Sequence, residues 1–249
     1  MKEYGLIGEF LSHSYSKNYF SEKFKEAGID ASYELFELKN IDELDALINE
    51  RPNLCGFNVT IPYKQQIIPF CDKLEKPARI AGAVNTVKIK RVKDAYLLEG
   101  YNTDIKGFES ILESETFISK SPSKALILGT GGASKAVQYA LRSHGIGFLL
   151  ASRNISKKGQ INYAMISEKI IKTYPLIINT TPLGMYPDIR SKPPIPYGSI
   201  GAEHLLIDLV YNPEETTFLK EGKSRGAAVI NGMQMFKEQA ELAWKIWQK

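Results

Sequence analysis

Short apolar runs alternate along the chain with segments whose apolar residues recur at helical spacing. The runs that predict strands are 4–8, 33–38, 54–59, 84–89, 96–101, 125–128, 148–151, 176–178, 205–209 and 227–230. The segments that predict helices begin after Ser16, at Asn40, at Pro62, at Asn102 and at Ala133, and a long one covers 232–247. This alternation is typical of an α/β protein whose parallel sheet is covered on both faces. Runs 84–89 and 96–101, joined by a charged turn, predict one antiparallel pair.

Composition changes this picture little. The 249 residues are 43% hydrophobic and 24% charged, which is normal for a chain with a packed core. The net charge of +4 is spread along the chain, without the basic run of a nucleic-acid-binding tail. Cys55 and Cys71 lack metal-ligand spacing, and no apolar run approaches membrane-spanning length. We therefore expect a cytoplasmic protein with reduced thiols, no metal, and no membrane or nucleic-acid partner.

The most informative stretch follows the apolar run 125–128. Gly129, Gly131 and Gly132 come directly after it, and an amphipathic helix then begins at once. A glycine turn between strand and helix lets the backbone approach a pyrophosphate, and the helix N-terminus favours its negative charge. The stretch therefore predicts a Rossmann-type dinucleotide site. Ser134 stands where the fingerprint has its third glycine, so helix and strand must lie slightly further apart or accommodate a small hydroxyl.

The end of the next predicted strand indicates which dinucleotide binds. An acidic residue about 20 positions beyond the glycines would bind the ribose 2′-hydroxyl of NAD. This sequence has Ser152, Arg153 and Asn154 there, followed by Lys157 and Lys158, and no carboxylate. A guanidinium suits a 2′-phosphate, so NADP is favoured over NAD. A solvated basic turn is the alternative interpretation of these residues.

Polar residues gather at the ends of three apolar segments in the first half of the chain. They are Asn58, Thr60 and Lys64, then Asn85 and Thr86, then Asn102 and Asp104. Because sites in α/β proteins form at strand ends, a Lys–Asp pair there would be suited to bind a hydroxyl and exchange a proton with it. Taken singly, each cluster fits a turn or helix cap better.

Eight motifs, in order and spanning nearly the whole chain, resemble those of the shikimate dehydrogenase family. They are Leu11-Ser-His-Ser-Tyr-Ser, Gly56-Phe-Asn-Val-Thr-Ile-Pro-Tyr-Lys, Gly82-Ala-Val-Asn-Thr, Gly100-Tyr-Asn-Thr-Asp-Ile-Lys-Gly-Phe, Leu128-Gly-Thr-Gly-Gly-Ala-Ser-Lys-Ala, Asn179-Thr-Thr-Pro-Leu-Gly-Met, Asp208-Leu-Val-Tyr-Asn-Pro and Gly232-Met-Gln-Met-Phe-Lys-Glu-Gln-Ala. The resemblance implies reversible, NADPH-linked reduction of 3-dehydroshikimate to shikimate.

The resemblance also implies an architecture and a set of site residues. An N-terminal three-layer α/β substrate domain would comprise 1–103 and 232–249, and a Rossmann-type, doubly wound NADP-binding domain would comprise 104–231. Lys64 and Asp104 would be the catalytic pair. The substrate-binding residues would be Ser14, Ser16, Thr60, Asn85, Asp104, Tyr211 and Gln239. The cofactor-binding residues would be Gly129, Thr130, Gly131, Gly132, Ala133, Ser152, Arg153, Lys157, Thr180, Gly232 and Met235.

Several alternatives stay open at this stage. One of the two serines fits a helix cap, Gln239 fits a half-exposed helix residue, and Thr180 or Met235 fits an ordinary loop or core position. The segment between Arg153 and Leu176 is short, which predicts that one crossover helix is trimmed or lost. The rival functions are a quinate or shikimate dehydrogenase that uses NAD, and a catalytically silent nucleotide-binding protein on the same fold. Both a monomer and a homodimer fit the sequence.

Overall fold

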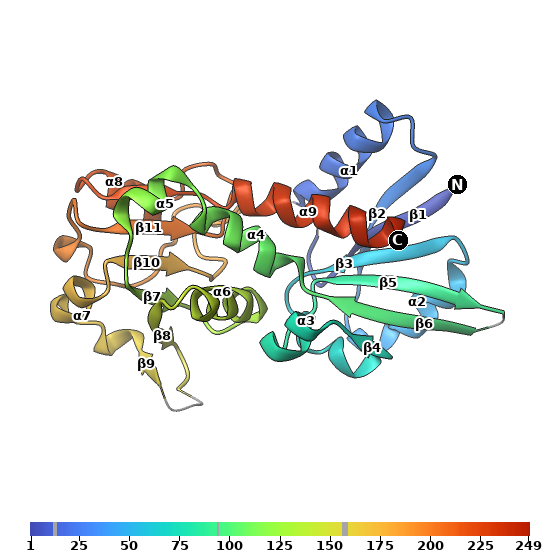
Figure 1. The fold of residues 1–249 in the computed structure, drawn as a ribbon, viewed down its shortest axis with the longest axis horizontal. Coiled ribbons are helices and arrows are strands. Elements are labelled where there is room, and N and C mark those ends of the chain that lie inside the picture. Colours follow the sequence, from blue (N-terminus) through green and yellow to red (C-terminus); the bar gives the residue numbers. More distant parts are fainter. Residues whose placement is uncertain (12–13, 94, 156–158) are drawn as a thin grey trace. The chain divides into compact units, whose positions relative to one another are not determined.

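The computed structural model describes residues 1–11, 14–93, 95–155 and 159–249, which form two compact units (Figure 1). The first unit comprises 1–103 and 240–249, and the second comprises 104–239. The division after residue 103 lies where we expected a domain boundary. Residues 232–239 were expected in the first domain, but they pack with the second unit.

The first unit is built on a six-stranded mixed sheet. Its strands are β1 (Lys2–Gly8), β2 (Ala31–Glu37), β3 (Leu54–Val59), β4 (Lys73–Leu74), β5 (Thr86–Val92) and β6 (Ala95–Tyr101), in the order β2-β1-β3-β5-β6-β4. β1 runs parallel to β2 and β3, whereas β5 runs antiparallel to β3 and β6. The antiparallel pair predicted from the sequence is therefore present beside a parallel group.

Helices cover both faces of this sheet. One face packs against α2 (Leu44–Glu50), α3 (Lys76–Ala81) and the turns around Tyr63 and Ile67. The other face packs against α1 (Tyr15–Glu26) and the last part of α9 (Met233–Gln248). The second face is rich in aromatic rings, namely Tyr4, Phe20, Phe24, Tyr33, Trp244 and Trp247. Three layers result, in agreement with the predicted fold class.

The helix expected to begin at Pro62 does not form. Residues 61–67 make consecutive turns, in which the Tyr63 N–H donates to the Thr60 carbonyl (2.9 Å) and the Ile67 N–H to the Tyr63 carbonyl (2.9 Å). The reason lies in packing, because both side chains enter the core and the Tyr63 hydroxyl donates to the Leu38 carbonyl (2.6 Å). Local preference for a helix is commonly overridden by such tertiary contacts.

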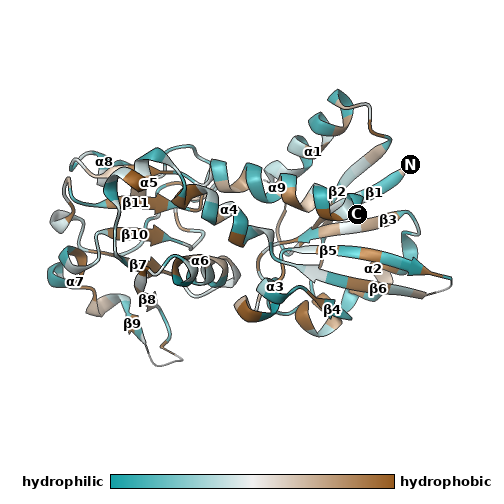
Figure 2. Cartoon of the chain, in the orientation of Figure 1, coloured by the Kyte–Doolittle hydropathy of each residue, from teal (hydrophilic) through white to brown (hydrophobic). Residues whose placement is uncertain are grey.

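The second unit is built on a parallel sheet of six strands. They are β7 (Lys124–Leu128), β8 (Gly147–Ser152), β9 (Gln160–Asn162), β10 (Leu176–Asn179), β11 (Leu205–Asp208) and β12 (Ala228–Ile230), in the order β12-β11-β10-β7-β8-β9. The central strands are apolar except for one polar residue at an end of each, Lys124, Asn179 or Asp208 (Figure 2), as strands buried on both faces require. α4 (Thr103–Leu112), α5 (Glu115–Lys120), α6 (Gly132–Ser143) and the start of α9 cover one face. α7 (Glu168–Thr173), α8 (Thr217–Lys223) and residues 195–200 cover the other.

The connection between β8 and β9 is the part of this unit that departs from a regular doubly wound sheet. Only residues 153–159 join these two parallel strands, and the six-residue α7 is the one α-helix between β9 and β10. Parallel neighbours are usually linked by a dozen residues or more that include a helix. The prediction that a crossover helix is trimmed or lost is therefore confirmed.

Candidate functional site

The glycine turn of the second unit lies between β7 and α6, at the carboxyl end of the sheet. Gly129 has a φ of +107°, and a side chain on it would place its Cβ 2.7 Å from Thr180 Oγ1. Gly131 precedes α6, and a Cβ there would meet no protein atom within 4 Å. The first N–H groups of an α-helix have no partner within the helix. The turn therefore fits a pyrophosphate, which needs close backbone approach and N–H donors.

Ser134 shows how the fold replaces the third glycine of the fingerprint. Its side chain is buried, and Oγ donates to the Gly129 carbonyl (2.9 Å). The same oxygen accepts a hydrogen bond from Gln138 Nε2 (3.1 Å). Of the two predicted solutions, the structure thus accommodates the hydroxyl and uses it to tie the helix to the glycine turn.

The end of β8 carries the residues predicted to select the cofactor. Ser152 is buried, and its hydroxyl donates to the Asn154 carbonyl (2.8 Å), which shapes the turn. The exposed side chain of Arg153 forms no ion pair with any residue that the structure describes. Lys157 lies outside the described residues. The described part of this turn therefore holds a cation and no carboxylate, as a 2′-phosphate requires.

Of the remaining predicted cofactor residues, Thr180 and Gly232 lie on the loops that follow β10 and β12, and Met235 lies in the first turn of α9. The backbone N–H and the hydroxyl of Thr180 both donate to the Leu128 carbonyl, at 2.9 and 2.7 Å. Gly232 passes so close to the Leu209 carbonyl that a Cβ would collide with it. Met235 is buried in the core cluster beneath the sheet, so it has a packing role of its own. Thr180 and Gly232 are held close to the backbone of neighbouring strand ends.

Gln239 is part of α9, and Tyr211 packs against the same helix. The Tyr211 ring lies 4.7 Å from that of Phe236, and Gln239 Nε2 donates to the Phe236 carbonyl (3.0 Å). Gly107 of α4 allows this helix to approach closely, because a Cβ there would lie 2.7 Å from the Met235 carbonyl. This close crossing explains why residues 232–239 pack with the second unit.

A buried polar network lies where β3, β5 and β6 present their ends in the first unit. Asn85 Oδ1 accepts from the Thr103 N–H (2.7 Å), and its Nδ2 donates to Thr103 Oγ1 (2.9 Å). Asn58 joins the network, because its Nδ2 donates to Thr86 Oγ1 (3.0 Å). Asp104, which is buried, directly follows Thr103 in the chain. The network thus fixes the backbone from which the Asp104 side chain extends.

Two partners in this network were missing from the sequence-based prediction. Thr103 bonds to both ends of the Asn85 amide, since its N–H donates to Oδ1 and its hydroxyl accepts from Nδ2. The Tyr33 hydroxyl donates to Asn58 Oδ1 (2.8 Å). Thr103 could have been found from its position between Asn102 and Asp104. No local signal marks Tyr33, because its pairing depends on the register of β1 with β2 and β3.

The other predicted substrate residues follow β1 and β3 at the same edge of the sheet. Ser14 caps α1, and its Oγ accepts from the Ser16 N–H (3.2 Å), so the capping role is confirmed. The Thr60 N–H donates to the Ile7 carbonyl (2.9 Å). The carbonyl of Lys64, a half-buried residue, accepts from the Val84 N–H (2.7 Å), which ties its turn to the segment that carries Asn85.

The residues that the structure describes contain neither a cluster of metal ligands nor a membrane-spanning helix. Within them, no group of three or more His, Cys, Asp or Glu side chains is suited to hold a metal ion. No helix among them has both the length and the apolar character needed to cross a membrane.

The parallel, doubly covered sheet and its glycine turn define the second unit as a dinucleotide-binding α/β unit of the Rossmann class. A family model for the shikimate dehydrogenase substrate binding domain matches residues 6–87, in the first unit. The chain is 40% identical over 260 residues to Shikimate dehydrogenase (NADP(+)) of Clostridium beijerinckii, covering 100% of this chain and 93% of that relative. It therefore belongs to the shikimate dehydrogenase family.

Solved structures agree with this assignment. Shikimate dehydrogenase 1 from Peptoclostridium difficile superposes with a TM-score of 0.86 at 36% identity, covering 100% of this chain and 92% of that one. A shikimate 5-dehydrogenase from Thermus thermophilus, in complex with NADP(H) and shikimate, superposes with a TM-score of 0.82 at 29% identity, covering 99% and 93%. The predicted family and fold class are thereby confirmed.

Proposed function

We propose that this protein catalyses the reversible, NADPH-dependent reduction of 3-dehydroshikimate to shikimate. The observation that carries the proposal is the full-length relationship to Shikimate dehydrogenase (NADP(+)), which includes both units. The glycine turn, the cation at Arg153 and the polar strand ends of the first unit support it. We further propose that the protein works in the cytoplasm as a monomer or a homodimer.

The first unit supplies most of the proposed substrate contacts. Ser14 and Ser16 lie at the start of the 12-residue α1, where the hydroxyls and the helix dipole suit the substrate carboxylate. The ring hydroxyls would bind Thr60, Asn85, Asp104 and Gln239, with Tyr211 close by. The internal hydrogen bonds of Asn85 support this role, because they hold its amide in one orientation.

The second unit supplies the proposed cofactor contacts. Residues 129–133 would hold the pyrophosphate, and Ser152, Arg153 and Lys157 would hold the 2′-phosphate. Thr180, Gly232 and Met235 would flank the nicotinamide half. When bound, NADPH supplies the hydride that the C3 carbonyl carbon of the substrate accepts.

The Lys64 ammonium is the proposed proton donor to the oxygen at C3. As hydride arrives, this oxygen develops negative charge and takes a proton, so a cationic acid nearby stabilises it. The Asp104 carboxylate would hold the ammonium in place, because a carboxylate is the natural hydrogen-bond acceptor for a cationic donor. In the reverse direction the same pair accepts the proton.

A single assay tests the function. We expect the purified protein to oxidise NADPH in the presence of 3-dehydroshikimate, and to use NADH much more slowly. Faster turnover of quinate or shikimate with NAD would instead support the NAD-dependent alternative. Binding of NADPH without turnover of any of these substrates would support a catalytically silent nucleotide-binding protein.

A further inference from the structure

A buried carboxylate lies at the end of β11 and is used by none of the proposed contacts. Asp208 is fully buried, and its Oδ1 accepts from Asn179 Nδ2 (3.0 Å) and from the Val210 N–H (3.0 Å). Its Oδ2 accepts from Thr216 Oγ1 (2.6 Å), the residue that caps α8. No cation within the described ranges faces it. Asp208 is therefore held by uncharged donors, two from the loop between β11 and α8 and one from the end of β10.

Asp208 determines which way the Asn179 side chain points. An amide presents an oxygen acceptor on one side and an NH2 donor on the other. Since Oδ1 of Asp208 already receives an N–H from Val210, it is an acceptor in either protonation state of the carboxyl. The NH2 of Asn179 must therefore face Asp208, and the amide oxygen must face the loop that follows β10.

The oriented amide in turn shapes that loop. Asn179 Oδ1 accepts from the Thr181 N–H (3.0 Å) and from Thr181 Oγ1 (2.6 Å). Asn179 Nδ2 also donates to the Leu183 carbonyl (3.2 Å). A flipped amide would set NH2 against the Thr181 donor and lose these bonds. The curve of residues 180–184, and with it the place of Thr180, thus depends on the amide orientation.

The same carboxylate also holds the loop that follows β11. The Val210 N–H donates to Asp208, which fixes the position of Val210. The Val210 carbonyl in turn accepts from the Gly232 N–H (3.2 Å). Tyr211 follows directly. The loop after β10, which carries Thr180, and the loop after β11, whose Val210 carbonyl holds Gly232, are therefore joined at one buried side chain.

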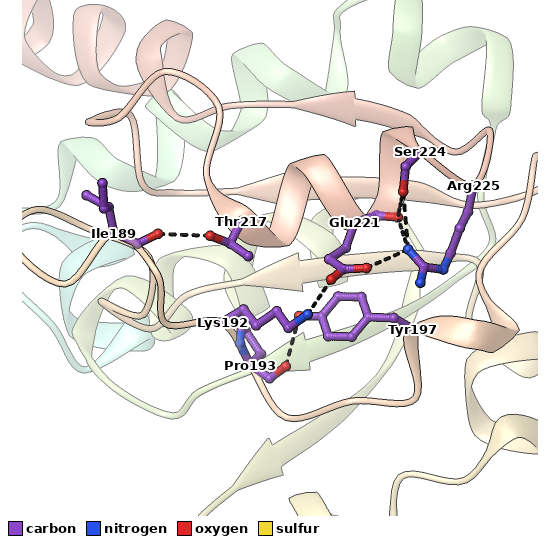
Figure 3. Close-up of polar contacts among 8 residues, drawn as sticks. All are labelled: Ile189, Lys192, Pro193, Tyr197, Thr217, Glu221, Ser224 and Arg225. Carbon is purple, nitrogen blue, oxygen red and sulfur yellow. Dashed lines mark hydrogen bonds and ion pairs between the residues drawn. The ribbon is translucent and has the colours of Figure 1, made fainter.

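A second group of contacts links the β10–β11 connection, residues 180–204, to α8 (Figure 3). There Glu221 of α8 contacts both Lys192 and Arg225, and Thr217 Oγ1 donates to the Ile189 carbonyl (2.9 Å). These side chains are exposed or half-buried, and ion pairs of this kind contribute little. This cluster provides a matched control, because it joins the same connection to the same helix.

We propose that Asp208 is a positioning residue for the nicotinamide half of the cofactor. It acts by fixing the Asn179 amide and, through it, the loop 180–184 that carries Thr180. This inference rests on the proposed function only for the identity of the cofactor. Wild-type turnover of 3-dehydroshikimate tests the function itself, whereas the variants below are compared with wild type for binding of NADPH.

The central variant is Asp208→Leu, which keeps a similar volume and removes both acceptors. We expect the dissociation constant for NADPH to rise about tenfold, because the three hydrogen bonds that fix the Asn179 amide and the two loops are lost. The affinity for 2′,5′-ADP, which has the 2′-phosphate but no nicotinamide, should stay within about twofold of wild type. In the turnover assay kcat should fall, while KM for 3-dehydroshikimate stays nearly constant.

Two further variants complete the test. Asp208→Asn should restore most NADPH affinity, because its amide oxygen can accept the same two N–H groups while its NH2 donates to Thr216. Asn179→Ala should lower NADPH affinity as Asp208→Leu does, although the hydrogen bonds that Val210 and Thr216 donate to Asp208 stay intact. The control Glu221→Gln should bind NADPH and 2′,5′-ADP as wild type does.

Four results would overturn the proposal. They are unchanged NADPH affinity in Asp208→Leu, an equal loss of affinity for 2′,5′-ADP, failure of Asp208→Asn to restore binding, and failure of both Asp208→Leu and Asn179→Ala to fold. The last result would make the network a requirement of the fold rather than of the cofactor site.

Discussion

Asn85 illustrates how far single residues can be understood from the sequence. Its place at a strand end indicated a polar site, and Asp104 was grouped with it on the same argument. The bond pattern that joins them through Thr103 was not predictable, because it depends on how β3, β5 and β6 are aligned. The sequence therefore predicted which polar residues lie at strand ends, but not the hydrogen-bond partners of each side chain.

Lys64 provides the sharpest test at this scale. Lys64→Ala should lower turnover by about two to four powers of ten, the usual contribution of a general acid. Asp104→Asn should lower it similarly, whereas Lys39→Ala, an exposed lysine of the same unit, should leave it unchanged. The measurement is kcat for NADPH oxidation with 3-dehydroshikimate. Near-normal turnover in Lys64→Ala would remove this lysine from the mechanism.

Asp208 should make stability depend on pH. Burial raises the pKa of this carboxyl from 3.8 to about 7, against the lowering effect of its hydrogen bonds from Thr216, Val210 and Asn179. Between these values the unfolded chain has released a proton that the folded protein keeps, so folding stability falls as pH rises.

Asp208→Asn removes this titration and keeps the shape. Relative to wild type, the variant should therefore gain free energy of unfolding as pH rises from about 4 to about 7, by a few kcal/mol in total. Urea unfolding followed by circular dichroism at several pH values measures the difference. A difference that is constant with pH would contradict the expected ionisation.

At the scale of elements, the strand–turn–helix of β7 and α6 was predictable and the segment after β3 was not. The glycine turn is a local motif, because its conformation follows from the glycines themselves. The turns at 61–67 instead result from the burial of Tyr63 and Ile67 against distant strands. The loss of the crossover helix after β8 was visible because chain length alone limits what a segment can form.

The two glycines of the turn should respond differently to alanine. Gly129→Ala should lower both stability and NADPH affinity, because its φ of +107° disfavours a side chain and its Cβ would meet Thr180 Oγ1. Gly131→Ala, with a φ of −74° and open space, should leave the melting temperature unchanged. It should still weaken NADPH binding about tenfold or more, because the added Cβ would enter the space proposed for the pyrophosphate. Equal melting temperatures of the two variants would contradict this account.

At the scale of the whole molecule, α9 belongs to both units. Its first residues pack against α4, and its last residues close the aromatic cluster of the first unit. The sequence predicted the long helix and its return to the first unit. It did not show where along the helix the units divide. That point depends on the close approach of α9 to Gly107 of α4, a residue distant in sequence.

Trp247 should carry much of the stability that α9 gives to the first unit. Its ring stacks on Tyr4 at 4.9 Å and covers Gly56, and its Nε1 donates to the Val87 carbonyl (3.0 Å). Trp247→Ala should cost about 3–5 kcal/mol, measured by urea unfolding and circular dichroism. Trp244→Ala, at a half-buried position, should cost less. NADPH affinity should persist in Trp247→Ala, and its complete loss would show that the second unit depends on this side chain.

The path of the chain through α9 also sets the order in which the protein can be assembled during synthesis. Domains usually fold as they emerge, with the N-terminal one first. Here the second unit has all of its residues once position 239 has been made, whereas the first unit still lacks 240–249. The part of the molecule that is encoded first is therefore the last to be completed, and until then the face of its sheet that Trp247 covers stays open to water.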